Sequence, residues 1–463
     1  MTVDQQAFKN IVIIGASIAG HEAANHLSSN LPPNYRILLI DARSFAWWPI
    51  TILRAVVTPG WEYKLTIPLT TDRVFKRGTP HQVIAPNKVI SLKESSVVLE
   101  RPFEGSNEVP FFRCVIATGA SQPLPTMPGW NQTESEFIES LKAAQRDVEK
   151  AKKVVVVGGG AVGVEIAGEI AAHHPDKSVT LVHKDYGLLS PTPPDEIQGK
   201  VQQGGKEVGS YSSPPTDPRL SIELKKICDK LGIKVILNDR VIIPPCASPY
   251  LPKEVEDEED EEDGRIKNAH ESENQGKLPK AWNGHFGLQP SLVTLKLKSG
   301  KSLEADYVYP GCGMKPNSKL VRDVDEGALD GELIRVNEYL KVTTKNPGES
   351  IFSKERYYAV GDVCSSPGFK IARTAIVNAP KAATNIINEI KEKPLSKYSA
   401  GPISHLDLPL GPNEGAGMTN FGWLGTWVFG SRFTTMIRGK TSGTERVFVG
   451  RFRGEKKSEI VFD

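Results

Sequence analysis

The chain has 463 residues, more than one hydrophobic core normally holds, so two or three domains are expected. Hydrophobic residues make up 39% and charged residues 24%, the composition of an ordinary soluble globular protein. The net charge is +2, but residues 254–263 hold nine acidic groups, which leaves 57 basic against 46 acidic residues elsewhere. A basic body can attract anionic cofactors, membranes or nucleic acid, although an evenly solvated mixed surface is the simpler interpretation.

The first predicted unit is "NIVIIGASIAGHEAANHL", residues 10–27, an apolar strand followed by a tight turn and an alanine-rich helix. Gly15 and Gly20 take the outer positions of a G-x-G-x-x-G fingerprint, and Ser17 takes the middle one, where backbone must approach a pyrophosphate closely. The next strand, "RILLID", ends in Asp41, about 20 residues after Gly20, where a carboxylate accepts hydrogen bonds from an adenosine ribose. The spacing therefore predicts a dinucleotide-binding unit.

A second unit of the same layout follows at residues 152–170, "KKVVVVGGGAVGVEIAGEI", with its fingerprint at Gly158, Gly160 and Gly163. Between the two units, "CVIATGA" at 114–120 is a strand ending in Thr118-Gly119. At such a strand end the chain often leaves a first nucleotide-binding domain and enters a second one. We therefore expect the second nucleotide domain to be inserted into the first.

The strand after the second glycine loop, "VTLVH", ends in His183 rather than in an acid, and Lys184 and Asp185 follow. An acid there would accept from both ribose hydroxyls of NADH and repel the 2′-phosphate of NADPH. His183 and Lys184 do neither, so NADPH is expected to be accepted at least as well as NADH. A small shift of register would return a carboxylate, that of Asp185, to the ribose.

A late strand, "ERYYAVGDVCS" at 355–365, ends in Gly361-Asp362. Alone, this pattern favours a simple turn. After two glycine loops it favours a carboxylate, Asp362, directed at FAD from the side opposite the first loop.

Residues 191–219, rich in Pro, Gly and Ser, and residues 245–285, with the acidic run, are expected to be disordered surface loops. Near the C-terminus, residues 418–440 combine five aromatic side chains with Arg432, Arg438 and Lys440. They form either a membrane-facing surface that admits a lipidic quinone or ordinary core over the flavin domain.

The five cysteines include no C-x-x-C pair, which argues against a disulfide framework, a zinc site and a redox-active disulfide. Residues 1–10 lack a signal-peptide pattern, Thr2 excludes N-myristoylation, and no apolar stretch approaches the roughly 20 residues that span a bilayer. We expect a cytoplasmic protein, with membrane or mitochondrial association left open.

The motifs and their order resemble the two-dinucleotide-binding-domain flavoproteins, and within them the AMID and ferroptosis-suppressor group, related to type II NADH:quinone dehydrogenases. The segments that carry the resemblance are "ILRA" (52–55), 154–170, 179–183, "IRVNEYLKV" (334–342), "YAVGDV" (358–363) and "IINEIKEKPLSKY" (386–398). The resemblance implies FAD and NAD(P)H as cofactors, Arg54 near the flavin and adenine contacts from the backbone of Val83. It also matches Lys391 to a position near the flavin, although an exposed helix-end lysine is the simpler interpretation.

The expected cofactor-binding residues are Gly15, Ala16, Ser17, Ile18, Ala19, Gly20, Asp41, Arg54, Val83, Thr118, Gly119, Gly361 and Asp362 for FAD, and Gly158, Gly160, Gly163 and His183 for NAD(P)H. No catalytic acid–base residue and no metal ligand is expected. The fold class expected is α/β, with two Rossmann-like domains built on mainly parallel sheets. The FAD domain spans 1–125 and 306–400, the NAD(P) domain spans 126–305, and an α+β segment spans 401–463.

The activity that the resemblance implies is hydride transfer from NAD(P)H to the flavin, followed by electron transfer to a quinone-type acceptor. Two alternatives stay open. One is a redox sensor or nucleic-acid-binding flavoprotein with little turnover, although no specific nucleic acid is expected; the other is a reductase of a small electron-transfer protein. Residues 418–440 are a candidate for peripheral membrane contact, and the sequence does not indicate an oligomeric state.

Overall fold

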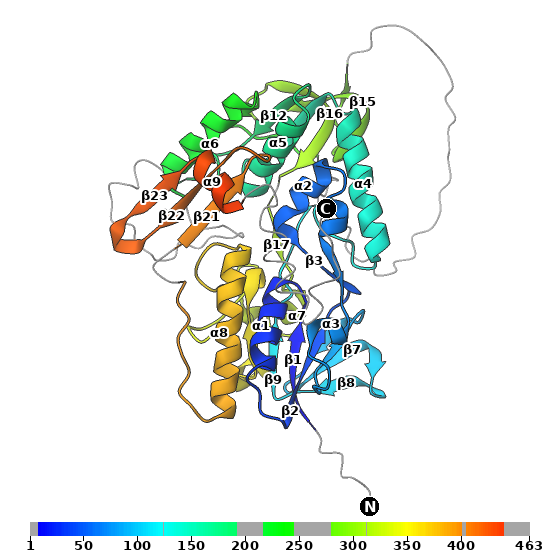
Figure 1. The fold of residues 1–463 in the computed structure, drawn as a ribbon, viewed down its shortest axis with the longest axis vertical. Coiled ribbons are helices and arrows are strands. Elements are labelled where there is room, and N and C mark those ends of the chain that lie inside the picture. The colour runs from blue at the N-terminus through cyan, green and yellow to red at the C-terminus, as the bar shows by residue number, and fades with distance from the viewer. Residues whose placement is uncertain are drawn as a thin grey trace, which may run out of the picture.

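The structure, a computed structural model, describes residues 8–123, 125–191, 216–244, 279–311, 313–400 and 404–438. Two α/β lobes lie one above the other in Figure 1, and a third, smaller sheet flanks the upper lobe. The two large sheets are mainly parallel, as expected, with antiparallel pairing between β15 (Gly287–Lys296) and β16 (Ser302–Pro310).

The lower lobe is built on a five-stranded parallel sheet in the order β20-β9-β1-β2-β5. Side chains of β1 alternate between two cores because the strand is buried on both faces: Ile11 and Ile13 face one core and Val12 and Ile14 the other. Helices α1 and α8 pack together on the first of these faces, and the antiparallel sheet β6-β7-β8 packs on the second. The bounds are β1 Lys9–Ile14, α1 Ile18–Ser28, β2 Tyr35–Ile40, β5 Gln82–Ile84, β6 Val89–Leu92, β7 Ser96–Phe103, β8 Ser106–Pro110, β9 Arg113–Ile116, β20 Tyr357–Ala359 and α8 Ala372–Ile390.

The upper lobe is built on a six-stranded sheet in the order β13-β12-β11-β16-β15-β14. Its helix α4 begins with a capping box, in which Thr133 and Glu136 each satisfy the other's free backbone N–H, and α6 begins with Asp217 as cap and Pro218 in the first turn. The bounds are α4 Glu134–Lys150, β11 Lys153–Val157, α5 Ala161–His173, β12 Ser178–Val182, α6 Pro218–Lys230, β13 Lys234–Ile236 and β14 Lys280–Ala281.

The chain crosses between the lobes twice, and the crossings pair as the short antiparallel strands β10 (Ala120–Ser121) and β17 (Lys315–Pro316). Strand β16 belongs to the upper sheet as far as Pro310, so the expected boundary at residue 306 falls inside it. The smaller elements are β3 Phe45–Trp47, α2 Ile52–Val57, β4 Thr66–Pro68, α3 Thr71–Val74, α7 Lys319–Arg322, β18 Leu329–Asp330 and β19 Leu333–Ile334.

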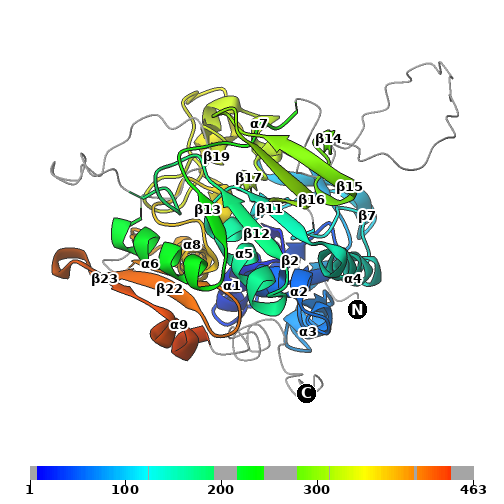
Figure 2. The same ribbon diagram turned by 90° about the horizontal axis from the view of Figure 1, so that it is seen from above.

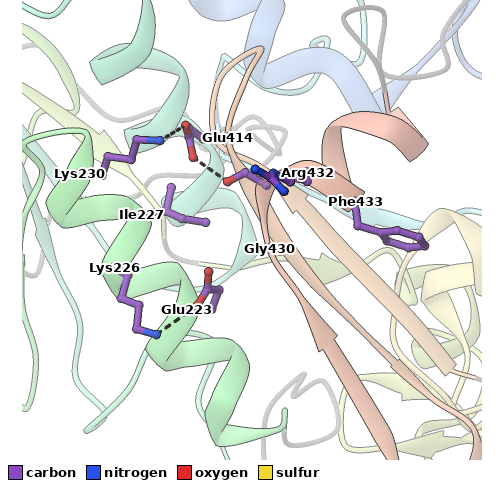
Figure 3. Close-up of a pocket in the computed structure, with 9 residues that line it drawn as sticks. Glu223, Lys226, Ile227, Lys230, Glu414, Gly430, Arg432 and Phe433 are labelled. Carbon is purple, nitrogen blue, oxygen red and sulfur yellow. Dashed lines mark hydrogen bonds and ion pairs between the residues drawn. The ribbon is translucent and has the colours of Figure 1, made fainter.

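A three-stranded antiparallel sheet closes the described chain, with β21 (Ser404–Pro409), β22 (Gly415–Asn420), β23 (Thr426–Phe429) and then helix α9 (Ser431–Arg438). This C-terminal sheet packs on α5 and α6 of the upper lobe, beside which it lies in both ribbon views (Figures 1 and 2). Glu414 ties it there, because its carboxylate accepts from Lys230 of α6 at 2.6 Å and from Ser431 at 2.6 Å beside a cavity of about 460 Å³ (Figure 3).

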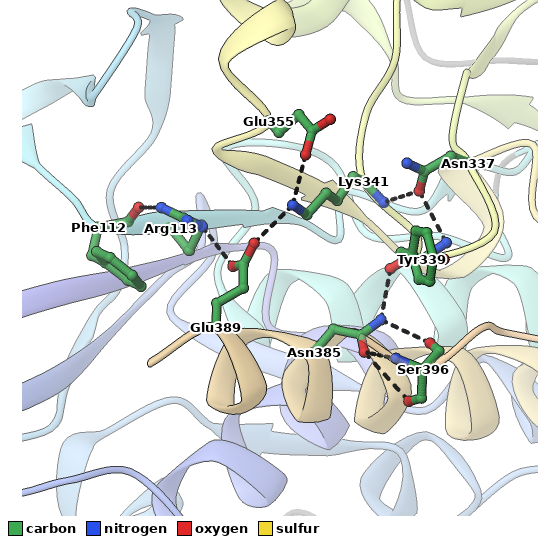
Figure 4. Close-up of polar contacts among 9 residues, drawn as sticks. All are labelled: Phe112, Arg113, Asn337, Tyr339, Lys341, Glu355, Asn385, Glu389 and Ser396. Atoms are coloured by element: carbon green, nitrogen blue, oxygen red, sulfur yellow. Dashed lines mark hydrogen bonds and ion pairs between the residues drawn. The ribbon is translucent and has the colours of Figure 1, made fainter. Parts of the chain in front are cut away.

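The conspicuous motifs at 334–342 and 386–398 meet in one polar network (Figure 4). Glu389, near the end of α8, accepts from Arg113 of β9 at 2.7 Å and pairs with Lys341 at 2.8 Å. Asn385, one helical turn earlier, donates to the carbonyls of Tyr339 and Ser396. These residues therefore hold α8 on its sheet. Lys391 caps the far end of α8 and is exposed.

Helix α2 belongs to the N-terminal part of the chain, yet it packs against α4 and α5 of the upper lobe. The guanidinium of Arg54 meets Glu169 of α5 at 2.9 Å, with the side chains only 4% and 3% exposed, and lies 5.2 Å from the ring centroid of Trp61. This buried ion pair joins two segments that are 115 residues apart in sequence. Arg54 was expected near the cofactor; in the structure its guanidinium is paired with Glu169, and a contact with the cofactor stays a prediction.

We expect Arg54→Met to destabilise the protein by about 3–5 kcal/mol, because it leaves the Glu169 carboxylate buried without its partner. The double variant Arg54→Met/Glu169→Leu should recover most of this loss. Denaturant midpoints measure both. Lys142→Met, which removes a surface pair with the 60%-exposed Glu139, is the control and should shift the midpoint very little. Equal losses in the single and double variants would show that the pair itself is not what holds the interface.

Candidate functional site

The first glycine loop is closed by contacts that leave no room for side chains. Gly15 has φ +101°, and a Cβ built there would lie 2.4 Å from the carbonyl oxygen of Ala117. A Cβ on Gly20 would lie 1.8 Å from the carbonyl oxygen of Gly15. Ser17, at the middle position and the N-cap position of α1, has ordinary extended backbone, so the protein itself does not require glycine there.

Asp41 stands at the end of β2, beside that loop. One carboxylate oxygen accepts from the backbone N–H of Ala16 at 2.7 Å, and the other accepts from that of Arg43 at 2.9 Å. Burial raises the pKa of Asp41, and the charge of Arg43 opposes that rise. Asp41 therefore braces the loop while it lines the cavity described below.

The opposite side of the site is formed by the turn after β20. Gly361 has φ +76° and its N–H donates to Asn378 of α8 at 3.2 Å. One carboxylate oxygen of Asp362 is buried without a hydrogen-bond partner within the protein. Burial raises the pKa of Asp362 to about 6, against the effect of Lys370, whose ammonium donates to the carbonyls of Cys364 and Ser366.

These segments surround one cavity of about 680 Å³ between the lobes. It is lined by the first glycine loop, Asp41, the strand end at Ala117–Ala120, the Gly361-Asp362 turn and the start of α8. Asn317 of the return crossing further fixes this strand end. The backbone carbonyls of Thr118 and Gly119 accept from Asn317, and the hydroxyl of Thr118 donates to the carbonyl of Asn317. An apolar wall completes the cavity with Phe45, Ala46, Trp47, Trp48, Pro49, Ile50, Ile52 and Leu53.

The second glycine loop makes the same two close backbone contacts as the first. Gly158 donates to the last residue of β12 as Gly15 does to that of β2, and a Cβ on Gly163 would lie 1.8 Å from the carbonyl oxygen of Gly158. Gly160 meets no protein atom within 4 Å at its Cβ position, which leaves space for a ligand. The helix that follows turns Ala161, Val162 and Glu165 toward the same cavity.

His183 is the structural counterpart of Asp41. Its Nδ1 accepts from the N–H of Gly159 at 3.0 Å, just as the carboxylate of Asp41 accepts from Ala16. Burial lowers the pKa of His183, so a neutral ring with its proton on Nε2 fits the site, and Nε2 lies 3.5 Å from Asp185. The carboxylate of Asp185 is itself bound by Lys184 at 2.7 Å and by Ser190 at 2.5 Å.

The cavity brings together most of the expected FAD residues, namely Gly15, Ala16, Ser17, Ile18, Ala19, Asp41, Thr118, Gly119, Gly361 and Asp362. Gly20 lies behind the loop that it closes. Arg54 and Val83 do not line the cavity: Arg54 pairs with Glu169, and the N–H of Val83 donates to Thr71 at 3.0 Å. Gly158, Gly160, Gly163 and His183 form the adjoining loop of the upper lobe.

Sequence reasoning missed six ionisable side chains that line the cavity: Arg43, Glu165, Lys370, Arg373, His405 and Asp407. Glu165 had a readable signal, because it is the first acid after the second fingerprint and lies one turn into α5. His405 and Asp407 come from β21 of the C-terminal sheet, and no sequence motif indicates that this strand lies at the cavity.

The residues present fit a flavin dinucleotide. The cradle of glycine backbone at the start of α1 suits a pyrophosphate, since the helix N-terminus presents free N–H groups to an anion. The partnerless oxygen of Asp362 supplies an acceptor on the opposite wall. Within the described part of the chain, no group of three His, Cys, Asp or Glu side chains is placed to hold a metal ion.

Comparisons with known proteins agree with this geometry. The family model described as pyridine nucleotide-disulphide oxidoreductase matches residues 9–209. The chain is 26% identical over 420 residues to ferroptosis suppressor protein 1 of Homo sapiens, covering 90% of each, and 29% identical over 419 residues to that of Xenopus laevis, again covering 90% of each.

The chain is therefore similar to the ferroptosis-suppressor proteins over most of its length, and its residues 9–209 match the pyridine nucleotide-disulphide oxidoreductase model. Its fold is similar to that of a ferredoxin reductase from Rhodopseudomonas palustris, with a TM-score of 0.55 and 15% identity over 89% of this chain and 82% of that one. It is an NAD(P)H-dependent flavoprotein oxidoreductase, with FAD and NAD(P)H as its cofactors.

We expect Asp362→Ala to bind FAD about 10- to 150-fold more weakly, because a hydrogen bond to a charged group contributes about 1.5–3 kcal/mol. Flavin content after purification and titration of the apoprotein with FAD measure this. Asp330→Ala, at an exposed acid on β18 outside the cavity, is the control. An Asp362→Ala protein that keeps full FAD affinity would contradict the assignment.

Asp362→Asn should raise the Tm of the flavin-free protein at pH 7–8. A carboxyl whose pKa is raised from 3.8 to about 6 in the folded state disfavours folding once it ionises there. This penalty is complete above pH about 6 and falls away as pH drops toward 4. The gain in Tm from Asn should shrink over the same window. A pH-independent difference in Tm would contradict it.

The substitution His183→Asp places in the second glycine unit the residue type that Asp41 provides in the first. The carboxylate can accept from Gly159, as Asp41 does from Ala16, and it would repel a 2′-phosphate. We expect the ratio of kcat/KM for NADH over NADPH to rise by roughly 10-fold or more, since a difference of 1.4 kcal/mol is tenfold. His183→Asn, which adds no charge, is the matched control. An unchanged ratio in the Asp variant would refute this role for the strand end.

Proposed function

We propose that the protein is an FAD-dependent NAD(P)H:quinone oxidoreductase. The observation that carries the proposal is a single cavity walled by both nucleotide-binding lobes and by the C-terminal sheet. A dinucleotide held on each side accounts for the polar walls. The apolar wall of Phe45, Trp47, Trp48 and their neighbours suits a flat, largely apolar acceptor such as a quinone.

The proposed roles follow from position. The first glycine loop and Asp41 hold the pyrophosphate and ribose of FAD, Asp362 binds it from the opposite wall, and the second glycine loop holds NAD(P)H. Glu165 lies where the helix behind that loop faces the cavity, so its carboxylate can accept from the amide of a nicotinamide and orient it. Bound here, the flavin would supply the hydride-accepting and electron-transferring chemistry, and the residues named above would hold the two dinucleotides for it.

The proposal also assigns a membrane contact to the tip of the C-terminal sheet. Trp423 is 90% exposed and Leu424 67% exposed in the turn between β22 and β23. Two large apolar side chains exposed at this protruding turn suit peripheral insertion into a lipid surface. No helix in the described ranges has the length and apolar character to cross a bilayer. A cytoplasmic protein working at a membrane or mitochondrial surface fits these features.

The function is tested with purified, FAD-loaded protein. NAD(P)H should bleach the flavin absorbance in a stopped-flow measurement, and a soluble ubiquinone analogue should restore it within turnover time. Negligible reoxidation by any quinone, together with rapid reduction of a ferredoxin, would replace the proposal with that of a protein reductase. Slow turnover with every acceptor and steeply salt-dependent DNA binding would favour a sensor instead.

The membrane contact gives a separate prediction. Trp423→Ser/Leu424→Ser should sediment with phosphatidylcholine vesicles several-fold less than the parent, because it removes most of the apolar surface at the tip. Its kcat with a water-soluble quinone should be unchanged. The control Ile222→Ser/Ile242→Ser changes exposed apolar side chains of the upper lobe, 57% and 53% exposed, and should leave binding as it was. Equal loss in both double variants would remove the tip from the proposal.

A further inference from the structure

Two ionisable side chains of β21, His405 and Asp407, line the flavin cavity from the C-terminal sheet. They stand two residues apart on one strand and so share a face. His405 Nε2 lies 3.2 Å from a carboxylate oxygen of Asp407, and the side chains are 18% and 8% exposed. An imidazole and a carboxylate are thus held together, largely out of water, at the wall of a redox site.

The ring of His405 is fixed from its other side. Nδ1 is hydrogen-bonded to the hydroxyl of Thr419 on β22 at 2.8 Å. The ring stacks on Phe429 of β23, with centroids 5.8 Å apart and planes 18° apart. Nδ1 is therefore held within the sheet, whereas Nε2 lies on the side of Asp407 at a separation at the long end of the hydrogen-bond range.

The charged groups around this pair are few. Strand β21 packs against β22, α5 and α9. Within the described residues, β22 carries no ionisable side chain, α5 presents Glu165 to the cavity, and Arg432 of α9 lines the other cavity, beside α6. The remaining charged residues of the flavin cavity are Asp41, Arg43, Asp362, Lys370 and Arg373.

We propose that His405 is the proton donor to the acceptor and that Asp407 is its positioning residue. This rests on the proposed function.

Reduction of a quinone to a quinol takes two electrons and two protons. The donor NAD(P)H supplies both electrons and one proton as a hydride equivalent, by way of the flavin. The second proton leaves Nε2 of the protonated ring: that N–H bond breaks, an O–H bond forms on the acceptor oxygen, and the ring is reprotonated from water. The net reaction is NAD(P)H + H⁺ + quinone → NAD(P)⁺ + quinol.

The placement also selects a class of acceptor. A carbonyl oxygen that becomes a hydroxyl needs a proton within hydrogen-bond reach, and imidazole is the side chain that exchanges protons near neutral pH. A one-electron carrier such as an iron–sulfur protein takes up no proton and has no use for the pair. His405 and Asp407 therefore point to a small acceptor that enters the cavity and is protonated there.

The test compares two acceptors in the FAD-loaded protein. His405→Gln keeps a side chain that can bond to Thr419 but holds no transferable proton at this pH. Its kcat with a soluble quinone should fall by about 10²-fold, the usual contribution of a positioned general acid. Its turnover with ferricyanide, which accepts electrons without protons, and its rate of flavin reduction by NAD(P)H should stay within about twofold of the parent.

Asp407→Asn supplies the positioning test. Removing the negative charge disfavours the protonated ring. The limb of the quinone pH–rate profile that falls toward alkaline pH should therefore move to lower pH, with the ferricyanide profile unchanged. Thr419→Val, which frees Nδ1 and leaves Asp407 in place, should lose less activity than His405→Gln.

A readout that involves no turnover is proton NMR of the oxidised protein. The chain has nine histidines, and the ring resonance missing from His405→Gln identifies that of His405. Its titration midpoint should move to lower pH in Asp407→Asn. A resonance that does not titrate between pH 5 and 9 would overturn the proposal.

Equal losses with quinone and ferricyanide in His405→Gln, or no loss with either, would also overturn it. These outcomes differ from failure of the proposed function. In that case the parent itself reduces no quinone, while it still oxidises NAD(P)H with ferricyanide.

Discussion

Two glycine-to-carbonyl contacts set the geometry on which the rest of the site depends. Gly20 against the carbonyl of Gly15, and Gly163 against that of Gly158, bring each first helix so close to its strand that any Cβ would collide. The close approach aims the N-termini of α1 and α5 at the space between the lobes. Both helix ends then offer unpaired N–H groups to anions from opposite sides of one cavity. The fold thus makes two anion sites that face a shared space.

The sequence predicted this part of the molecule well, because its signals are local. Strand, glycine loop, helix and terminal acid lie within about 30 residues, and each has a steric or hydrogen-bonding reason that a single sequence displays. The strand ends at Thr118 and Asp362 also lie where the pattern indicated. The spacing further implied that His183 would take the place of Asp41, and both accept from the second residue of their loop.

Sequence reasoning was limited where long-range packing decides which residues come together. Arg54 suited a phosphate by its chemistry, but its partner Glu169 lies 115 residues away in a helix of the other lobe, and no local pattern links the two. Val83 was placed by resemblance alone; its N–H donates to Thr71, and its contact with adenine stays a prediction. The expected boundary at 306 falls inside β16, because residues 307–310 pair in parallel with β11 of the upper sheet. His405 and Asp407 carry no motif; only the packing of β21 on α5 brings them to the cavity.

The polar groups of the cavity differ in how many of their hydrogen bonds the protein itself supplies. This difference separates groups that support the loops from a group that is left for a ligand. Asp41 receives two backbone N–H groups and His183 one, so both support loops whether or not a ligand is bound. Lys370 donates to two carbonyls and shapes the turn that carries Asp362.

Asp362 itself keeps a buried oxygen without a partner and a raised pKa, an arrangement that costs free energy in the protein alone. A hydrogen-bond donor on the ligand removes that cost, so binding and local stability are coupled at this one carboxylate. The glycine loops are therefore satisfied within the protein, whereas the turn at Asp362 leaves one buried acceptor for a ligand to satisfy.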